Sequence, residues 1–184
     1  QGKLNDAYKS FEKAIEITPN YAQSIFNMAK ILQDQGKLRE SVNFYNKAIS
    51  INPKYKEAYN NLGHILREQR KIAQSINCLI KLIKINPDYA NAYYNLGESL
   101  ALFNKSEEAS KCYLKAIKIN NKLIAAYNGL GNLLVKEKKF DKAQKYFKEA
   151  ILINPKIGHI LSSYWYSRLI CCDWSDQNKM YKEI

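Results

Sequence analysis

The sequence predicts an all-α protein, a right-handed α-solenoid of helix-turn-helix repeats. The first observation behind this prediction is a fixed period: Ile51-Asn52-Pro53 returns as Ile85-Asn86-Pro87 and Ile153-Asn154-Pro155, and 87 − 53 = 34. Near copies at Thr18-Pro19 and Asn120-Asn121 keep this period, since 53 − 19 = 34 and 155 − 121 = 34. The second observation is that each period holds two stretches of apolar residues at helical spacing. A stack of such units presents a long surface, which favours binding over catalysis.

Composition narrows the class of protein. A hydrophobic content of 46% excludes a disordered chain. The apolar runs are much shorter than the ~20 residues that cross a bilayer, so no membrane segment is expected. The four cysteines include no CxxC pair, and neither histidine stands at metal-ligand spacing. We therefore expect an intracellular protein, cytoplasmic or nuclear, that holds no metal and no cofactor.

The elements follow from the period in chain order. The match of Gln1-Gly2-Lys3 with Gln35-Gly36-Lys37 places the start of this chain inside a repeat. We therefore predict the second helix of a truncated repeat at 1–21, whole repeats at 22–55, 56–89, 90–123 and 124–157, and a capping helix with a junction segment at 158–184. The truncated end leaves Leu4, Tyr8 and Phe11 bare, which predicts a homo-oligomer formed through this end.

Residues 90–123 show the pattern of one repeat. The first apolar stretch carries Tyr93, Leu96, Gly97 and Leu100, and the second carries Ala109, Tyr113, Ala116 and Ile117. A polar break at Asn104-Lys105-Ser106 separates them, and Asn120-Asn121 ends the second. The repeat is therefore expected to be a pair of amphipathic helices.

The pattern resembles the tetratricopeptide repeat (TPR) family over residues 1 to 157. That family has an aromatic residue before Leu-Gly, a later Ala with an aromatic residue four positions on, and a closing Pro. The chain matches with Tyr59, Leu62-Gly63 and Pro87, with Tyr93, Leu96-Gly97, Ala109 and Tyr113, and with Tyr127, Leu130-Gly131, Ala143, Phe147 and Pro155. The resemblance implies a superhelix that binds proteins.

Small residues mark the line along which the two helices of a repeat meet. Gly63, Gly97 and Gly131 recur at one place in the first helix. We expect glycine there to let the two backbones approach, because a larger side chain would hold them apart. The prolines fix φ beyond the second helix and end it, which sets the angle to the next repeat.

The first helices also predict a binding groove. If Tyr93, Leu96 and Leu100 are buried, the opposite side of that helix carries residues 91, 95, 98 and 102. Projected through the array, this side carries a stripe of asparagines that Gly129 interrupts. The predicted peptide-binding groove comprises Asn27, Asn61, Asn95, Asn60, His64, Tyr94, Asn128 and Asn132.

Two interpretations of the asparagine stripe remain open. Asparagine inside a helix costs about 0.5 kcal/mol relative to alanine, so its recurrence needs a reason. An amide both donates and accepts, and it can pair with the backbone of an extended polypeptide whatever the ligand's side chains. Alternatively, asparagine is common at this place in TPR sequences and only tunes contacts between helices. A two-carboxylate clamp of the kind found in chaperone-binding modules is not expected, because Lys30, Arg67 and Lys136 do not recur at one position.

The net charge of +12 raises the question of a nucleic-acid partner. Lys111, Lys115 and Lys118 lie on one face of a predicted second helix, which is the outer helix of such arrays. No aromatic residues interleave with them, so this face is expected to be solvated and no nucleic-acid partner is predicted.

The pattern changes after Pro155. Trp165 stands where Gly131 stood one period earlier, so a capping helix or a docking face is expected. Cys172-Asp173-Trp174-Ser175-Asp176 and a predicted helix with Met180 then follow. Over Leu169 to Ile184 this passage resembles the junction between repeats and catalytic domain in O-GlcNAc transferase-like enzymes of glycosyltransferase family 41.

This second resemblance implies a function for the groove. It implies a downstream domain that transfers a sugar from a UDP-sugar to serine or threonine hydroxyls, with Asn27, Asn61 and Asn95 holding the acceptor polypeptide. The chain itself carries no nucleophile-base pair, phosphate loop or metal cluster, so this stretch is not expected to be an enzyme. The alternative is a TPR scaffold or adaptor of a multiprotein assembly with no enzyme attached.

Overall fold

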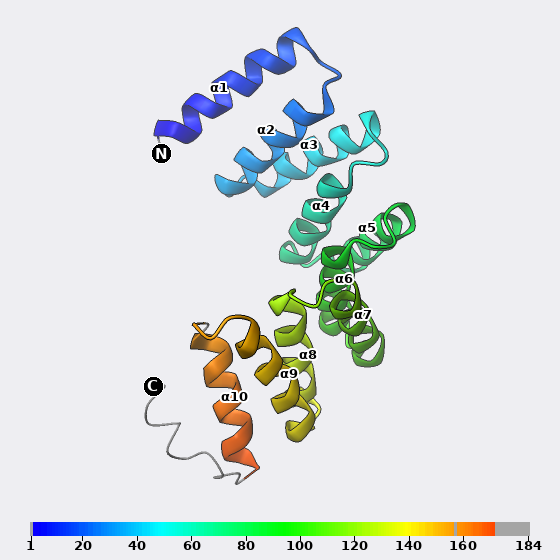
Figure 1. The fold of residues 1–184 in the computed structure, drawn as a ribbon. Helices are drawn as coiled ribbons and strands as arrows, with labels where there is room; N and C mark the ends of the chain where they lie inside the picture. Colours follow the sequence, from blue (N-terminus) through cyan, green and yellow to red (C-terminus); the bar gives the residue numbers. More distant parts are fainter. Residues whose placement is uncertain (1, 157, 172–184) are drawn as a thin grey trace. The chain divides into compact units, whose positions relative to one another are not determined.

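The structure, a computed structural model, describes residues 2–156 and 158–171, with only the backbone of residues 2–7. This part of the chain forms ten α-helices and no strand (Figure 1), which confirms the predicted all-α class. The helices are α1 (Gly2–Ile17), α2 (Ala22–Asp34), α3 (Leu38–Ile51), α4 (Lys56–Glu68), α5 (Ile72–Ile85), α6 (Ala90–Leu102), α7 (Ser106–Ile119), α8 (Ile124–Lys136), α9 (Phe140–Ile153) and α10 (Gly158–Ile170). None of the helices described is long and apolar enough to cross a membrane.

Two compact units divide between Pro87 and Asp88. In the first unit α2 packs against α3, α3 against α4 and α4 against α5, with α1 against α2. In the second unit each of α6 to α9 packs against the next helix, and α8 also contacts α6 and α10. The first helices of successive pairs in this unit therefore form one layer, as expected for a stack of helical hairpins.

The recurring glycines leave space that a side chain of the second helix fills. A Cβ on Gly97 would lie 2.8 Å from the Tyr113 ring, and one on Gly131 would lie 2.4 Å from the Phe147 ring. Both rings are at most 2% exposed. A side chain at these places would therefore hold the two helices apart, as expected, and the group that it would meet is an aromatic side chain of the second helix.

The turn inside each repeat uses one backbone conformation. Gly36, Arg70, Asn104 and Lys138 all have φ between 59° and 74°, the left-handed region. The next residue donates its N–H back to the helix, as in the 2.9 Å bond from Lys139 to the Leu134 carbonyl. This bond satisfies a carbonyl that the helix end would leave without a partner. Only Gly36 adopts this φ without a steric cost.

The asparagine of the Ile-Asn-Pro motif builds the turn between repeats. The side-chain oxygens of Asn52, Asn120 and Asn154 each accept the backbone N–H two residues on, at 3.0 to 3.1 Å. Asparagine forms such turns because its short side chain mimics a backbone carbonyl. The 34-residue period is thus held in place by turn chemistry as well as by packing.

Helix α10 ends the described chain. It packs against α9 and α8. Trp165 lies 5.2 Å from Tyr164 between ring centres, and the buried Arg168 guanidinium stacks over both rings. The predicted junction motif at Cys172 to Asp176 and the helix with Met180 lie outside the described residues.

Candidate functional site

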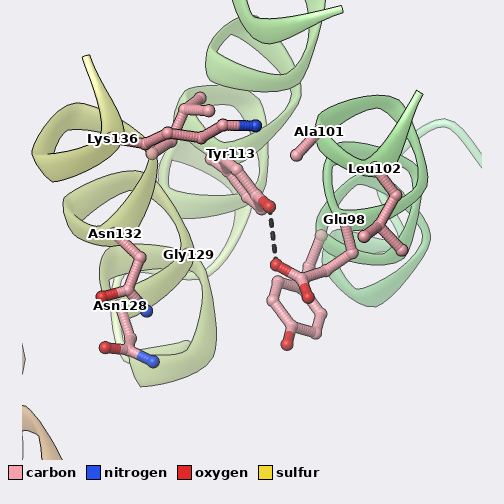
Figure 2. A pocket seen from close by; sticks show the side chains of 10 residues that line it. Glu98, Ala101, Leu102, Tyr113, Asn128, Gly129, Asn132 and Lys136 are labelled. Carbon is pink, nitrogen blue, oxygen red and sulfur yellow. Dashed lines mark hydrogen bonds between the residues drawn. The ribbon is translucent and has the colours of Figure 1, made fainter. Parts of the chain in front are cut away.

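A pocket of about 320 Å³ opens between α6 and α8. Tyr113 of α7 reaches into it from behind, and its hydroxyl points at Glu98 on α6 (Figure 2). Asn128, Asn132 and Lys136 project from α8 on the opposite wall. The complete lining is Tyr94, Glu98, Ala101, Leu102, Tyr113, Asn128, Gly129, Asn132, Leu133 and Lys136.

A short hydrogen bond fixes the acidic wall of the pocket. The Tyr113 hydroxyl donates to Oε1 of Glu98 at 2.6 Å. A bond to an ionised acceptor at this length is among the stronger hydrogen bonds in proteins. The Tyr113 ring is 2% exposed, so the donor has little freedom to move. The Glu98 carboxylate is therefore held in one orientation.

The space for this bond depends on the absence of a side chain at Gly129. A Cβ there would lie 2.8 Å from the Tyr113 ring and 3.2 Å from Oε1 of Glu98. The corresponding places one, two and three periods earlier carry Asn95, Asn61 and Asn27. The glycine that interrupts the asparagine stripe is thus what leaves this pocket open.

The first unit shows what asparagine does at the same place. Nδ2 of Asn61 donates to the Tyr45 hydroxyl at 3.1 Å, and that hydroxyl donates to Oε1 of Gln33 at 2.9 Å. Burial raises the pKa of Tyr45 to about 12, which keeps the hydroxyl protonated and able to donate. Gly129 follows Tyr113 by the same 16 positions that separate Asn61 from Tyr45. The Tyr113 hydroxyl lacks both partners, because Gly129 offers no amide and Ala101 stands at the place of Gln33, and it donates to Glu98.

Comparison with known families identifies the repeat. A family model described as TPR repeat matches residues 29–69, 63–102 and 104–137. Models described as tetratricopeptide repeat match residues 124–157 and 10–43. The chain belongs to the tetratricopeptide repeat family. The expectation drawn from its Leu-Gly and proline spacing is confirmed.

Several solved structures share the TPR fold. MamA is 26% identical to this chain, with a TM-score of 0.75 over 86% of this chain and 92% of that chain. PilF of Pseudomonas aeruginosa is 20% identical, with a TM-score of 0.83 over 95% of this chain and 79% of that one. YrrB, described as a TPR protein with an unusual peptide-binding site, is 19% identical, with a TM-score of 0.71 over 96% and 91%. No curated protein matches the sequence.

The TPR pocket brings together three of the eight residues predicted for the groove. Tyr94, Asn128 and Asn132 line it, whereas Asn95 is only 6% exposed. Glu98, Leu102 and Lys136 also line it; helical periodicity placed them on this side, but the prediction did not select them. Tyr113 was missed as a site residue. Its place in the repeat predicts a core aromatic residue, and nothing in the sequence indicates that its hydroxyl lines a pocket.

In the first unit the predicted groove residues mostly bond to neighbours. Asn27 accepts a bond from Gln23 at 3.2 Å, and Gln23 accepts one from the Tyr55 hydroxyl at 2.7 Å. His64 lies 3.8 Å from Glu68, an ion pair when the histidine is protonated. Asn60 is half-buried. The bond of Asn61 joins α4 to α3, whereas that of Asn27 lies within α2, and the role of both as ligand contacts stays a prediction.

The lysines of α7 and α9 that the sequence placed on one helix face are solvated. Lys111 pairs with Glu107 at 2.7 Å, and both side chains are more than 70% exposed. Exposed pairs of this kind add little to stability. Lys142, Lys145 and Lys148 of α9 are likewise exposed. These side chains form a charged surface on α7 and α9. These two helices contribute only Tyr113 to the lining of the α6/α8 pocket.

Among the described residues, no cluster of three or more potential metal ligands occurs. Burial raises the pKa of Cys78 to about 12 and that of Cys112 to about 11, so both remain neutral thiols at physiological pH.

The apolar residues of α1 are less exposed than the sequence predicted. Tyr8 and Phe11, which were expected to be bare, are half-buried, and the side chain of Leu4 lies outside the described residues.

Proposed function

We propose that this TPR array is a protein-interaction module that binds an extended polypeptide along the face formed by its first helices. The observation that carries the proposal is the open pocket between α6 and α8, which exposes amide, carboxylate and ammonium groups side by side. A pocket with a few convergent polar groups is a common form of a ligand site. YrrB, which shares this fold, is described as having a peptide-binding site.

The amides of α8 fit the backbone of such a ligand. Asn132 is exposed and can both donate and accept. Oδ1 of Asn128 is buried without a hydrogen-bond partner among the described residues. Asn128 lines the pocket, and its amide would have to turn toward the pocket before a peptide N–H could reach that oxygen. Backbone pairing of this kind tolerates many ligand sequences.

Titration against extended peptides tests the proposal. Peptides selected by display on this chain should bind it, and the pair Asn128→Ala and Asn132→Ala should weaken them by about tenfold, because two amide contacts are lost. Reversing Lys142 and Lys145 to Glu on α9 is the matched control, and it should leave affinity nearly unchanged. If the asparagine pair has no effect on affinity while the α9 pair abolishes it, the ligand binds the other face and the proposal is wrong.

We further propose that the array recruits acceptor polypeptides for an O-GlcNAc transferase-like enzyme in the same intracellular protein. Support comes from the junction-like sequence at Leu169 to Ile184 alone, since none of the similar proteins named above is described as a glycosyltransferase. The alternative is an adaptor without an enzyme. The open reading frame beyond Ile184 separates the two, because a family 41 catalytic domain there supports the first and a different sequence refutes it.

A further inference from the structure

We infer that the α6/α8 pocket takes a basic side chain, arginine or lysine, from the bound polypeptide. This inference rests on the proposed peptide-binding function and adds the chemistry of one ligand position. It starts from Glu98, the one carboxylate that lines the pocket. A carboxylate in a pocket recognises a cation by charge-assisted hydrogen bonds, and it pairs with a guanidinium in a two-pronged geometry.

Glu98 is positioned in advance and is available to a ligand. Its Oε1 accepts the Tyr113 hydroxyl at 2.6 Å, and no lysine, arginine or histidine nitrogen among the described residues lies within 4.0 Å of it. Gly129 leaves the room that this arrangement needs, because a Cβ there would stand 3.2 Å from Oε1. Binding a cation therefore requires neither the breaking of an ion pair nor the reorientation of the carboxylate, which lowers the cost of binding.

The rest of the pocket suits the stem of a basic side chain. Ala101, Leu102 and Leu133 supply apolar walls, and Leu102 is 51% exposed although it is a large aliphatic residue. Lysine and arginine bury their methylene stems along such surfaces while the charged head meets a polar group. The ring of Tyr94 also lines the pocket and can contribute to cation binding through its π face.

A carboxylate beside a glycine occurs at only one of the four equivalent places in the repeats. The places equivalent to Glu98 carry Lys30, His64 and Asn132, none of which is acidic. The residue equivalent to Gly129 is asparagine in each of the three earlier repeats. The carboxylate and the open space beside it therefore coincide only between α6 and α8, which makes this pocket a specificity position rather than a general feature of the array.

The positive charge of Lys136 provides a second test of the charge of the ligand group. It lines the same pocket from α8, is exposed and forms no ion pair with a described residue (Figure 2). If the ligand group is basic, Lys136 repels it; if the ligand group is acidic, Lys136 holds it. The chain also carries a net charge of +12, so any unspecific preference would be for anions. A preference for arginine must therefore come from Glu98.

The test is an NMR titration of the isotope-labelled 184-residue chain with three blocked amino acids: N-acetyl-arginine amide, N-acetyl-norleucine amide and N-acetyl-glutamate amide. We expect the arginine probe to bind most tightly and to shift the signals of Glu98 and Gly129.

Three variants test which residues cause this preference. Glu98→Gln keeps an acceptor for Tyr113 and should weaken binding of the arginine probe about tenfold, the effect of losing one charge-assisted bond. Lys136→Met should strengthen it by about threefold, on the scale of one exposed charge pair. Glu107→Gln on α7 is the matched control and should change nothing.

The outcomes separate this inference from the proposed function. Tighter binding of the glutamate probe, or an arginine affinity that Glu98→Gln leaves unchanged or Lys136→Met weakens, would overturn the basic pocket even if extended peptides bind the same face. Failure of every extended peptide to bind, with the arginine probe still shifting Glu98, would overturn the polypeptide function and leave the cation site standing. Thermal unfolding of each variant shows whether a lost signal reflects a lost fold.

Discussion

Replacing Gly129 by alanine puts a methyl group into the Tyr113 ring. The added Cβ would lie 2.8 Å from Cε1 and 3.0 Å from Cζ, whereas carbon atoms in contact prefer roughly 3.5–4.0 Å. The ring has little room to move, because it also packs against Gly97, where an added Cβ would lie 2.8 Å from the same Cε1 atom. We therefore expect the ring or α8 to shift, with loss of the bond to Glu98.

The expected change in the free energy of unfolding of Gly129→Ala results from two opposing effects. Overpacking of a filled core costs about 1–3 kcal/mol. Alanine gains about 1 kcal/mol over glycine inside a helix. The net effect should be a loss of roughly 0–2 kcal/mol in the free energy of unfolding, measured by urea titration followed by circular dichroism.

A double-mutant cycle isolates the steric term. Tyr113→Leu gives the residue found one period earlier at Leu79, and it should remove the clash, so the two substitutions together should cost less than the sum of their separate effects by about 1 kcal/mol. Gly158→Ala is the control, since a Cβ there has no neighbour within 4 Å. Additive effects, or a gain of about 1 kcal/mol from Gly129→Ala alone, would refute the reasoning.

Three further outcomes are expected. Lys138→Gly should raise the free energy of unfolding by about 1 kcal/mol because Lys138 has a φ of 59°, and Gly36→Ala should lower it by a similar amount; opposite signs in urea titration would show that the turn does not store this strain. Ser75→Ala should cost about 1 kcal/mol because the Ser75 hydroxyl, buried, donates to the Gly63 carbonyl at 2.7 Å, whereas exposed Ser50→Ala should cost much less; equal losses would contradict this. Because burial raises the pKa of Tyr45 from 10.0 to about 12, its contribution to stability should be complete below pH 10 and should fall as the pH rises through 12; unfolding midpoints that decline equally in Tyr45→Phe would exclude this cause.

Much of the fold could be predicted from the sequence because the repeat carries its own register. Helices α2, α4, α6 and α8 begin 34 residues apart, at Ala22, Lys56, Ala90 and Ile124. Periodicity also placed residues 98, 102, 132 and 136 on the side of the first helices where the α6/α8 pocket lies. These features depend on local propensity and on spacing, which one sequence displays directly.

The pocket itself could not be predicted, because it depends on side chains from three helices. The bond between Tyr113 and Glu98 lies in space that Gly129, in the next repeat, leaves beside both residues. From the sequence Gly129 is an interruption of the asparagine stripe, not a feature of a site. Asn95 shows the reverse case: it continues the stripe in the sequence but is buried in the structure.

The most direct test of the account is to map a bound polypeptide on the chain by NMR. A peptide selected by display on this protein would be titrated against the isotope-labelled chain, and the shifted signals would be assigned. Binding at the α6/α8 pocket should shift the signals of Glu98, Asn128, Asn132 and their neighbours on α6 and α8. Shifts confined to the lysine-bearing surface of α7 and α9, with Glu98, Asn128 and Asn132 unaffected, would contradict it.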